Sequence, residues 1–353
     1  MLRIKELDYL RGFAALGIMF YHYMKWLYIY DGAQSFIGRV SVYGVEIFYI
    51  LSGITLYHVY QNTLTLKKES LKLYFTKRFF RIFPLFWLSI LLTFIISLKF
   101  VGIPKLLLNV SGLFAIFAWD KTIALGTWSI GNELVFYLIF PFLMHFIKFN
   151  KLTFTILGLL FLFIFNYFAF YIFNPYDTLH NQWANYINPL NHLLLFYIGV
   201  CIPFILKQHK IAQLQALSFI VIGAFLLFAF PSGNNGIHLL YGINRWIFSI
   251  GSIFICFGFY KLEMNLPSYF DKIFKQLGET SYGIYLLHPF VYQLLCIAIR
   301  KHLALGYFFP KSNSLLIAIS VTITLITSNF VYNKFEKYFI KKGTAIITNS
   351  YKF

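Results

Sequence analysis

Acidic residues are scarce in this sequence: it has 12 Asp and Glu against 30 Lys and Arg, and only 12% of its 353 residues are charged. Hydrophobic residues make up 59% of the chain and aromatic residues 22%. A water-soluble domain cannot bury so much apolar surface, so the composition predicts a membrane protein with several spans. The net charge of +18 would suit a nucleic-acid partner, but the basic residues lie in short loops between apolar runs. We therefore expect a lipid bilayer as partner, and no nucleic acid.

Cysteine is also scarce, with three residues in the whole chain. Cys201, Cys256 and Cys296 lie in apolar stretches, and their spacing fits no metal-ligand motif. We expect them to pack as small hydrophobic side chains, without a disulfide or a metal site. Long polar segments are missing too, which predicts a single membrane domain over residues 1–345 and a short cytoplasmic tail over 346–353.

The apolar runs predict an all-α bundle of about ten transmembrane helices. Most Lys and Arg residues fall before the first run and in every second connection after it. Because basic residues favour the cytoplasmic side, both termini are predicted to be cytoplasmic, in a multi-pass protein of the inner or plasma membrane. The predicted spans are residues 9–30, 44–60, 80–100, 129–147, 152–173, 189–206, 213–230, 238–260, 280–299 and 314–333.

Two ionisable residues, Arg11 and His22, lie inside the first apolar segment. A charge near the bilayer centre costs about 3 kcal/mol on insertion scales, so one that is kept there usually has a partner and a function. Their separation is close to three helical turns, which places both side chains on one helix face, about 16 Å apart along the axis. Two simpler interpretations remain: Arg11 could snorkel to the inner surface, and His22 could be a hydrogen-bonded packing residue.

Two further segments carry charge into the predicted spans. In GVEIFYILSGITLYHVY, Glu46 lies near the outer end of the second span, where it could also be an ordinary interfacial carboxylate. In KRFFRIFP, Arg78 and Arg81 lie three residues apart, on one helix face at the cytoplasmic boundary. Such a pair could bind phosphates through charge-assisted hydrogen bonds, although the positive-inside rule alone could also explain it.

The last two segments lie in later spans. In TWSIGNELVFYLIFP, Trp128 and Glu133 lie at the outer start of the fourth span, where a carboxylate also stabilises a helix N-terminus. In LGETSYGIYLLHPF, Ser281 and Tyr282 lie near a predicted helix start at residues 279–281, and His288 follows before a proline. At 1.5 Å per residue His288 is about 12 Å deep, near the predicted depth of His22, so a buried pair or relay of the two histidines is possible.

These five segments, in this order on a ten-helix frame, resemble the acyltransferase-3 family of membrane acyltransferases, which includes O-acetylases of bacterial surface polysaccharides. Arg11 and His22 match the family's arginine, ten residues, histidine pattern. Arg78 and Arg81 match its R-x-x-R-I-x-P segment, and Glu133 matches the carboxylate of its W-S-x-x-x-E segment. The resemblance covers most of the chain and implies that Arg11 and His22 are essential to acyl transfer.

The resemblance also implies a donor and an acceptor. Arg78 and Arg81 would bind the anionic end of cytoplasmic acyl-CoA, which is a substrate and not a bound cofactor. His22 would act as general base on a hydroxyl of a cell-surface or lipid-linked glycan, or would form a transient acyl-histidine, with acetyl as the favoured acyl group. Glu133, in preference to Glu46, would orient the acceptor or the imidazole. Many members have a second acidic residue after that glutamate, where this chain has Leu134.

Two other functions are compatible with the same spans. A transporter or flippase for a lipid-linked saccharide also needs many helices and a few intramembrane charges, and it would move its substrate without consuming acyl-CoA. A non-catalytic relative could serve as a structural partner, but the presence of both Arg11 and His22 disfavours that interpretation. The sequence leaves the oligomeric state open.

Overall fold

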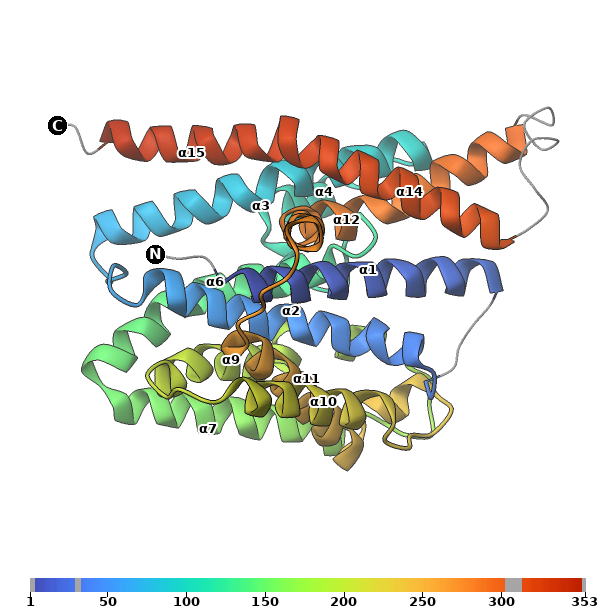
Figure 1. Cartoon of the computed structure of the whole chain (residues 1–353). Helices are drawn as coiled ribbons and strands as arrows, with labels where there is room; N and C mark the ends of the chain where they lie inside the picture. Colours follow the sequence, from blue (N-terminus) through green and yellow to red (C-terminus); the bar gives the residue numbers. More distant parts are fainter. Residues whose placement is uncertain (1–3, 29–32, 302–312, 351–353) are drawn as a thin grey trace.

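The computed structural model describes residues 4–28, 33–301 and 313–350, and this part of the chain is helical without strands. In chain order its elements are α1 Lys5–Tyr28, α2 Phe36–Tyr60, α3 Lys68–Ser97, α4 Ile103–Ser111, α5 Phe114–Phe117, α6 Trp128–Phe149, α7 Lys151–Tyr167, η1 Phe168–Ile172, α8 Trp183–Tyr186, η2 Pro189–His192, α9 Leu193–Leu206, α10 Gln213–Phe228, η3 Gly236–Leu239, α11 Gly242–Lys261, α12 Ser268–Lys301, α14 Asn313–Val331, η4 Tyr332–Glu336 and α15 Lys337–Ser350. Most of the long helices lie side by side in Figure 1. The all-α prediction is confirmed.

Eight helical stretches in the described residues are long and apolar enough to cross a membrane. They are α2, α3, α6, α7 with η1, η2 with α9, α11, α12, and α14 with η4 and α15. The other two predicted spans coincide with α1, which carries several charged residues, and with α10, which has 16 residues. The protein therefore has the helices of a multi-pass membrane protein, while the count of ten stays a prediction.

Several helices extend beyond the predicted spans, and the longest extensions are those of α3, α12 and α14. α3 begins at Lys68 instead of near residue 80, and α12 begins at Ser268 instead of at residues 279–281. α14 continues through η4 into α15 and ends at Ser350, so the domain boundary predicted at residue 345 lies inside a helix. Hydropathy ends where lipid contact ends, whereas lysine-rich segments remain good helix formers, so the apolar runs were shorter than the helices.

The site depends on close helix crossings at glycines. At Gly278 of α12 an added Cβ would lie 2.2 Å from the backbone oxygen of Asp8 in α1, and at Gly12 of α1 it would lie 2.8 Å from the Leu277 Cβ. At Gly199 of α9 it would lie 2.2 Å from the Ile50 oxygen of α2. Small residues let membrane helices approach backbone to backbone, which here fixes α1 and α2 between their neighbours.

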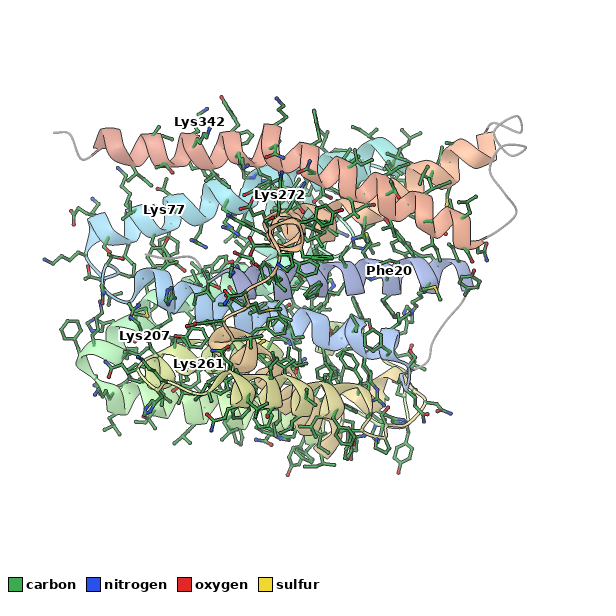
Figure 2. All side chains as sticks on the ribbon, viewed as in Figure 1. Phe20, Lys77, Lys207, Lys261, Lys272 and Lys342 are labelled. Atoms are coloured by element: carbon green, nitrogen blue, oxygen red, sulfur yellow. The ribbon has the colours of Figure 1, made fainter. Side chains whose placement is uncertain are left out.

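Several lysines share one half of the bundle with the last turns of α15. Lys77, Lys207 and Lys342 lie in the half where α15 ends, whereas Phe20 lies toward the other half (Figure 2). That this side is cytoplasmic stays a prediction.

Candidate active site

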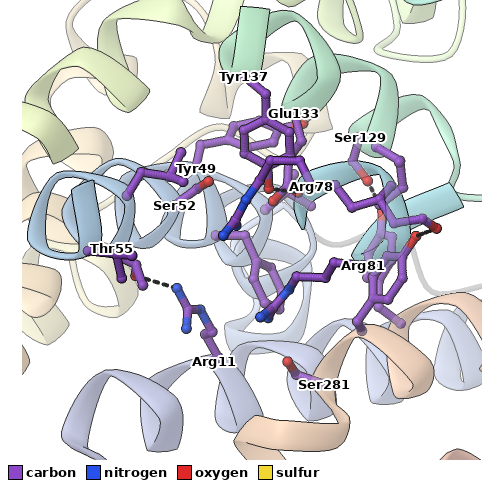
Figure 3. A pocket seen from close by; sticks show the side chains of 18 residues that line it. Arg11, Tyr49, Ser52, Thr55, Arg78, Arg81, Ser129, Glu133, Tyr137 and Ser281 are labelled. Carbon is purple, nitrogen blue, oxygen red and sulfur yellow. Dashed lines mark hydrogen bonds between the residues drawn. The ribbon is translucent and has the colours of Figure 1, made fainter. Parts of the chain in front are cut away.

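A cavity of about 180 Å³ lies between α1, α2, α3, α6 and α12. Figure 3 shows that the guanidinium groups of Arg11 from α1 and of Arg78 and Arg81 from α3 extend into the same space. Glu133 of α6 lines this space, as do Ser281 and Tyr282 of α12. Six predicted site residues, separated by up to 271 positions in sequence, thus line one cavity, which we call the arginine pocket.

Arg11 is held inside the bundle by contacts with α1 and α2. Its Nη1 lies 3.4 Å from Asp8 Oδ1, one turn earlier in α1. Its Nη2 donates to the Leu51 oxygen at 3.3 Å and to the Thr55 hydroxyl, both in α2. The side chain is 17% exposed and that of Asp8 is 4% exposed. Arg11 therefore joins α1 to α2 and keeps its charge at the edge of the cavity.

Tyrosines orient the charged groups opposite Arg11. Arg78 Nη2 donates to the Tyr60 hydroxyl at 3.3 Å, and the guanidinium lies 5.5 Å and 5.8 Å from the ring centroids of Tyr60 and Tyr137. The Tyr137 hydroxyl donates to Glu133 Oε2 at 2.7 Å. With Arg81, the cavity has three cations against one carboxylate, and Asp8 offsets only Arg11. The pocket is therefore electropositive and suits an anion.

The far end of the pocket is neutral and polar. Ser129 Oγ donates to the Tyr285 hydroxyl at 2.9 Å, and that hydroxyl donates to the Gly126 oxygen at 3.1 Å. Tyr282 donates to the Ile82 oxygen of α3 at 2.9 Å, which joins α12 to α3 beside Arg81. Four predicted residues, His22, Glu46, Trp128 and His288, do not line the pocket. Trp128 packs against aromatic rings of α8 and η2, those of Trp183, Tyr186 and His192.

The predicted histidine pair is confirmed. His22 Nδ1 lies 3.0 Å from His288 Nε2, and their rings are stacked with centroids 5.0 Å apart. His288 Nδ1 lies 3.0 Å from the Ile284 oxygen, so this nitrogen carries a hydrogen and Nε2 is the acceptor. His22 then donates a hydrogen bond from Nδ1 to His288, so His22 Nε2 carries no hydrogen and has a free lone pair. The pair lies next to the pocket, since the Tyr285 ring centroid is 6.2 Å from that of His288.

Glu46 lies apart from both groups. It is 0% exposed, does not line the arginine pocket, and accepts a hydrogen bond from Ser249 Oγ of α11 at 2.9 Å. The interpretation as an ordinary interfacial carboxylate is therefore wrong: the predicted outer end of the second span is covered by α11, which apolarity alone could not reveal. Among the described residues no group of three or more His, Cys, Asp or Glu side chains could hold a metal ion.

Sequence reasoning missed several residues of the pocket. Asp8 lies three positions before Arg11, and Tyr137 lies four positions after Glu133, so helical periodicity could have identified both as neighbours. Thr55 offers no such signal, because it reaches Arg11 from another helix. Ser129, the serine of the W-S-x-x-x-E segment, also lines the cavity, as do Ser52, Tyr49 and Tyr285, which have no distinctive spacing in the sequence.

Comparison with known proteins gives two matches. A family model described as an acyltransferase domain matches residues 4–340. A protein of Acidianus two-tailed virus, whose provisional name is that of an acetyltransferase, is 28% identical over 296 residues, which cover 81% of this chain and 82% of the viral protein. No solved structure is significantly similar to this chain.

Proposed function

The chain belongs to the acyltransferase-3 family and is a membrane acyltransferase, and we propose that it moves an acetyl group from cytoplasmic acetyl-CoA to a hydroxyl of a cell-surface or lipid-linked glycan. One observation carries this proposal: an electropositive pocket whose polar far end adjoins a histidine pair with a free imidazole lone pair. The pocket would supply an anion site, and the neighbouring histidine pair would supply a base.

The donor would bind through its phosphates. Coenzyme A is polyanionic, and guanidinium groups bind phosphate through paired, charge-assisted hydrogen bonds. Arg78 and Arg81 are the main candidates, because both line the pocket and Arg78 Nε has no hydrogen-bond partner within the protein. Arg11 already has three partners, so its charge would act mainly on the bound thioester end.

The cavity size supports a short acyl group. At about 180 Å³ it is only slightly larger than the engineered cavity of about 150 Å³ that holds a benzene molecule. An acetyl group fits such a volume, whereas the phosphate end of the same donor would have to lie at its opening. Acetyl is therefore the acyl group that we propose.

The transfer step would use His22 as general base. The acceptor hydroxyl gives its proton to His22 Nε2 while its oxygen attacks the thioester carbonyl. The tetrahedral intermediate then collapses, the carbon–sulfur bond breaks, and the departing thiolate takes the proton from the imidazolium. His288 would hold the required tautomer by accepting from His22 Nδ1. An acyl-histidine intermediate uses the same lone pair as nucleophile.

Glu133 would act on the arginines and not on the acceptor. Its carboxylate is held by Tyr137, whose ring lies under the Arg78 guanidinium. We infer that Glu133 limits the repulsion between the three arginines and keeps their side chains directed into the pocket.

The proposal is tested by incubating the purified full chain in nanodiscs with radiolabelled acetyl-CoA and candidate glycans. We expect label in the glycan and stoichiometric release of free coenzyme A. Movement of a lipid-linked saccharide across a vesicle membrane without consumption of acetyl-CoA would instead support the transporter and contradict the proposal.

A further inference from the structure

A second group of polar side chains lies outside the arginine pocket. Glu46 comes from α2, Arg245 from α11, Tyr186 from α8, and Asn191 and His192 from η2. We call these five residues the Glu46–Arg245 cluster. Tyr186 is 2% exposed and the other four are 0% exposed. Charged and polar groups buried this deeply in a membrane protein are costly unless their hydrogen-bonding groups find partners.

Direct bonds satisfy only part of the cluster. Ser249 Oγ donates to Glu46 Oε2 at 2.9 Å, and Arg245 Nη2 donates to the Asn191 oxygen at 2.8 Å. Arg245 and Ser249 lie one turn apart on the same face of α11, so Arg245 and Glu46 face each other across the helix contact. Both residues are described, and no direct ion pair joins them.

The remaining atoms include both donors and acceptors. Arg245 Nε and Nη1, Glu46 Oε1, Tyr186 Oη, Asn191 Oδ1 and His192 Nδ1 have no hydrogen-bond partner within the protein. His192 Nε2 lies 2.8 Å from the backbone oxygen of Tyr186. This nitrogen therefore carries the hydrogen, and His192 Nδ1 is an acceptor. Free N–H groups on Arg245 thus accompany free lone pairs on Glu46, Asn191 and His192, too far apart to bond to one another.

The free donors and acceptors together indicate which kind of ligand the Glu46–Arg245 cluster can bind. An anion would suit Arg245 but would be repelled by Glu46, and a cation would suit Glu46 but would be repelled by Arg245. Water donates and accepts, and a buried water typically makes about three hydrogen bonds to polar groups that the protein leaves unpaired. We propose that a small group of buried waters occupies the Glu46–Arg245 cluster and bridges the two charges.

The hydrated cluster adjoins the wall of the arginine pocket. Tyr49 lines that pocket, and its ring centroid lies 5.1 Å from that of His192. Its hydroxyl accepts from Asn132 Nδ2 at 3.0 Å, and Asn132 Oδ1, in a side chain 1% exposed, has no partner within the protein. The bound waters would therefore support Tyr49 from behind, and their loss would loosen one wall of the pocket.

Radiolytic footprinting tests this proposal directly, because hydroxyl radicals formed from bound water oxidise the side chains beside it even when bulk solvent is excluded. The full chain in nanodiscs is irradiated with millisecond X-ray pulses, and oxidation is measured by peptide mass spectrometry. Tyr74 is the matched control, since it is 0% exposed and its hydroxyl is bonded to the Tyr137 oxygen. We expect Tyr186 to be oxidised several-fold faster than Tyr74, and equal rates would overturn the proposal.

A variant tests the bridging role. In Arg245→Met, which lacks the donors, oxidation of Tyr186 should fall toward the rate of Tyr74. Unchanged oxidation would show that the waters do not depend on Arg245 and would overturn the bridge. If that variant does not fold, the paired variant Glu46→Leu with Arg245→Leu removes both charges together and provides the same measurement with the same two outcomes.

Discussion

The arginine pocket and the Glu46–Arg245 cluster both bury charged groups in the membrane domain. They differ in the balance of positive and negative charge and in the volume of the cavity beside those groups. The pocket has three arginines, one glutamate and a cavity of about 180 Å³. The cluster has one cation and one carboxylate, both 0% exposed. An excess of one sign beside an open space suits a charged ligand from outside, whereas a balanced, enclosed group suits a structural role. Identical residue types thus serve different purposes according to their surroundings.

The largest effect on the rate is expected at the histidine pair, which lies outside both the arginine pocket and the Glu46–Arg245 cluster. We expect His22→Ala to lower kcat by about 10²–10⁴-fold, the usual contribution of a general base, while Tm stays unchanged. Initial rates with radiolabelled acetyl-CoA measure this. Phe20→Ala, two positions away on α1 and 40% exposed, is the control and should keep the normal rate. A normal rate in His22→Ala would contradict its role as base or nucleophile.

Substitution of Arg245 tests the difference between the arginine pocket and the Glu46–Arg245 cluster most clearly. Removing one partner of a buried charge pair typically costs about 3–5 kcal/mol, so Arg245→Met should lower the free energy of unfolding by that amount. Thermal unfolding in detergent measures the loss. The paired variant Glu46→Leu with Arg245→Leu should be more stable than Arg245→Met alone. If the paired variant is the less stable of the two, the two charges do not balance each other.

Arg78 should show the opposite behaviour. We expect Arg78→Ala to raise the KM for acetyl-CoA by about 10- to 100-fold, because a hydrogen bond to a charged group contributes about 1.5–3 kcal/mol. Its stability should stay near that of the wild type. Lys77→Ala, an exposed neighbour outside the pocket, is the control and should leave KM unchanged. A large loss of stability without a change in KM would place Arg78 in the structural class instead.

The smallest effect is expected at His288. Substitution by Leu removes the acceptor for His22 Nδ1, and kcat should fall about tenfold, the value of one hydrogen bond of about 1.4 kcal/mol. Gln, whose amide oxygen can accept from His22 and whose amide nitrogen can donate to the Ile284 oxygen, should restore most of the rate. Nitrogen NMR of labelled His22 should show its Nδ1–H tautomer in the wild type and in His288→Gln only. An unchanged tautomer in His288→Leu would contradict the positioning role.

The sequence predicted those parts of the site that helical spacing controls. Arg11, Arg78, Arg81 and Glu133 were identified as charges inside apolar runs. The predicted spans placed Glu133 at the outer side and Arg78 and Arg81 at the cytoplasmic boundary, so their meeting at one cavity was not predicted. The depth rule of 1.5 Å per residue also placed His288 beside His22, from opposite ends of the chain.

The sequence could not reveal contacts that depend on which helices are neighbours. Thr55 reaches Arg11 across the contact of α1 with α2, and Glu46 is covered by α11. Hydropathy reports contact with lipid, so it also missed the helical extensions at Lys68 and Ser268, where the chain continues as helix with basic residues. Arg245 offers no such signal either, because Glu46, the charge that it faces, lies almost 200 positions earlier.

In the proposed mechanism, donor binding and acyl transfer are separated along α1, from the arginine pocket to His22. The most direct test measures acetyl-CoA binding by calorimetry and label transfer to glycan in the same preparations of His22→Ala and Arg78→Ala. We expect His22→Ala to bind acetyl-CoA with the Kd of the wild type and to transfer no label, and Arg78→Ala to bind weakly but to transfer label at saturating donor. Loss of donor binding in His22→Ala, or normal binding in Arg78→Ala, would contradict the separation.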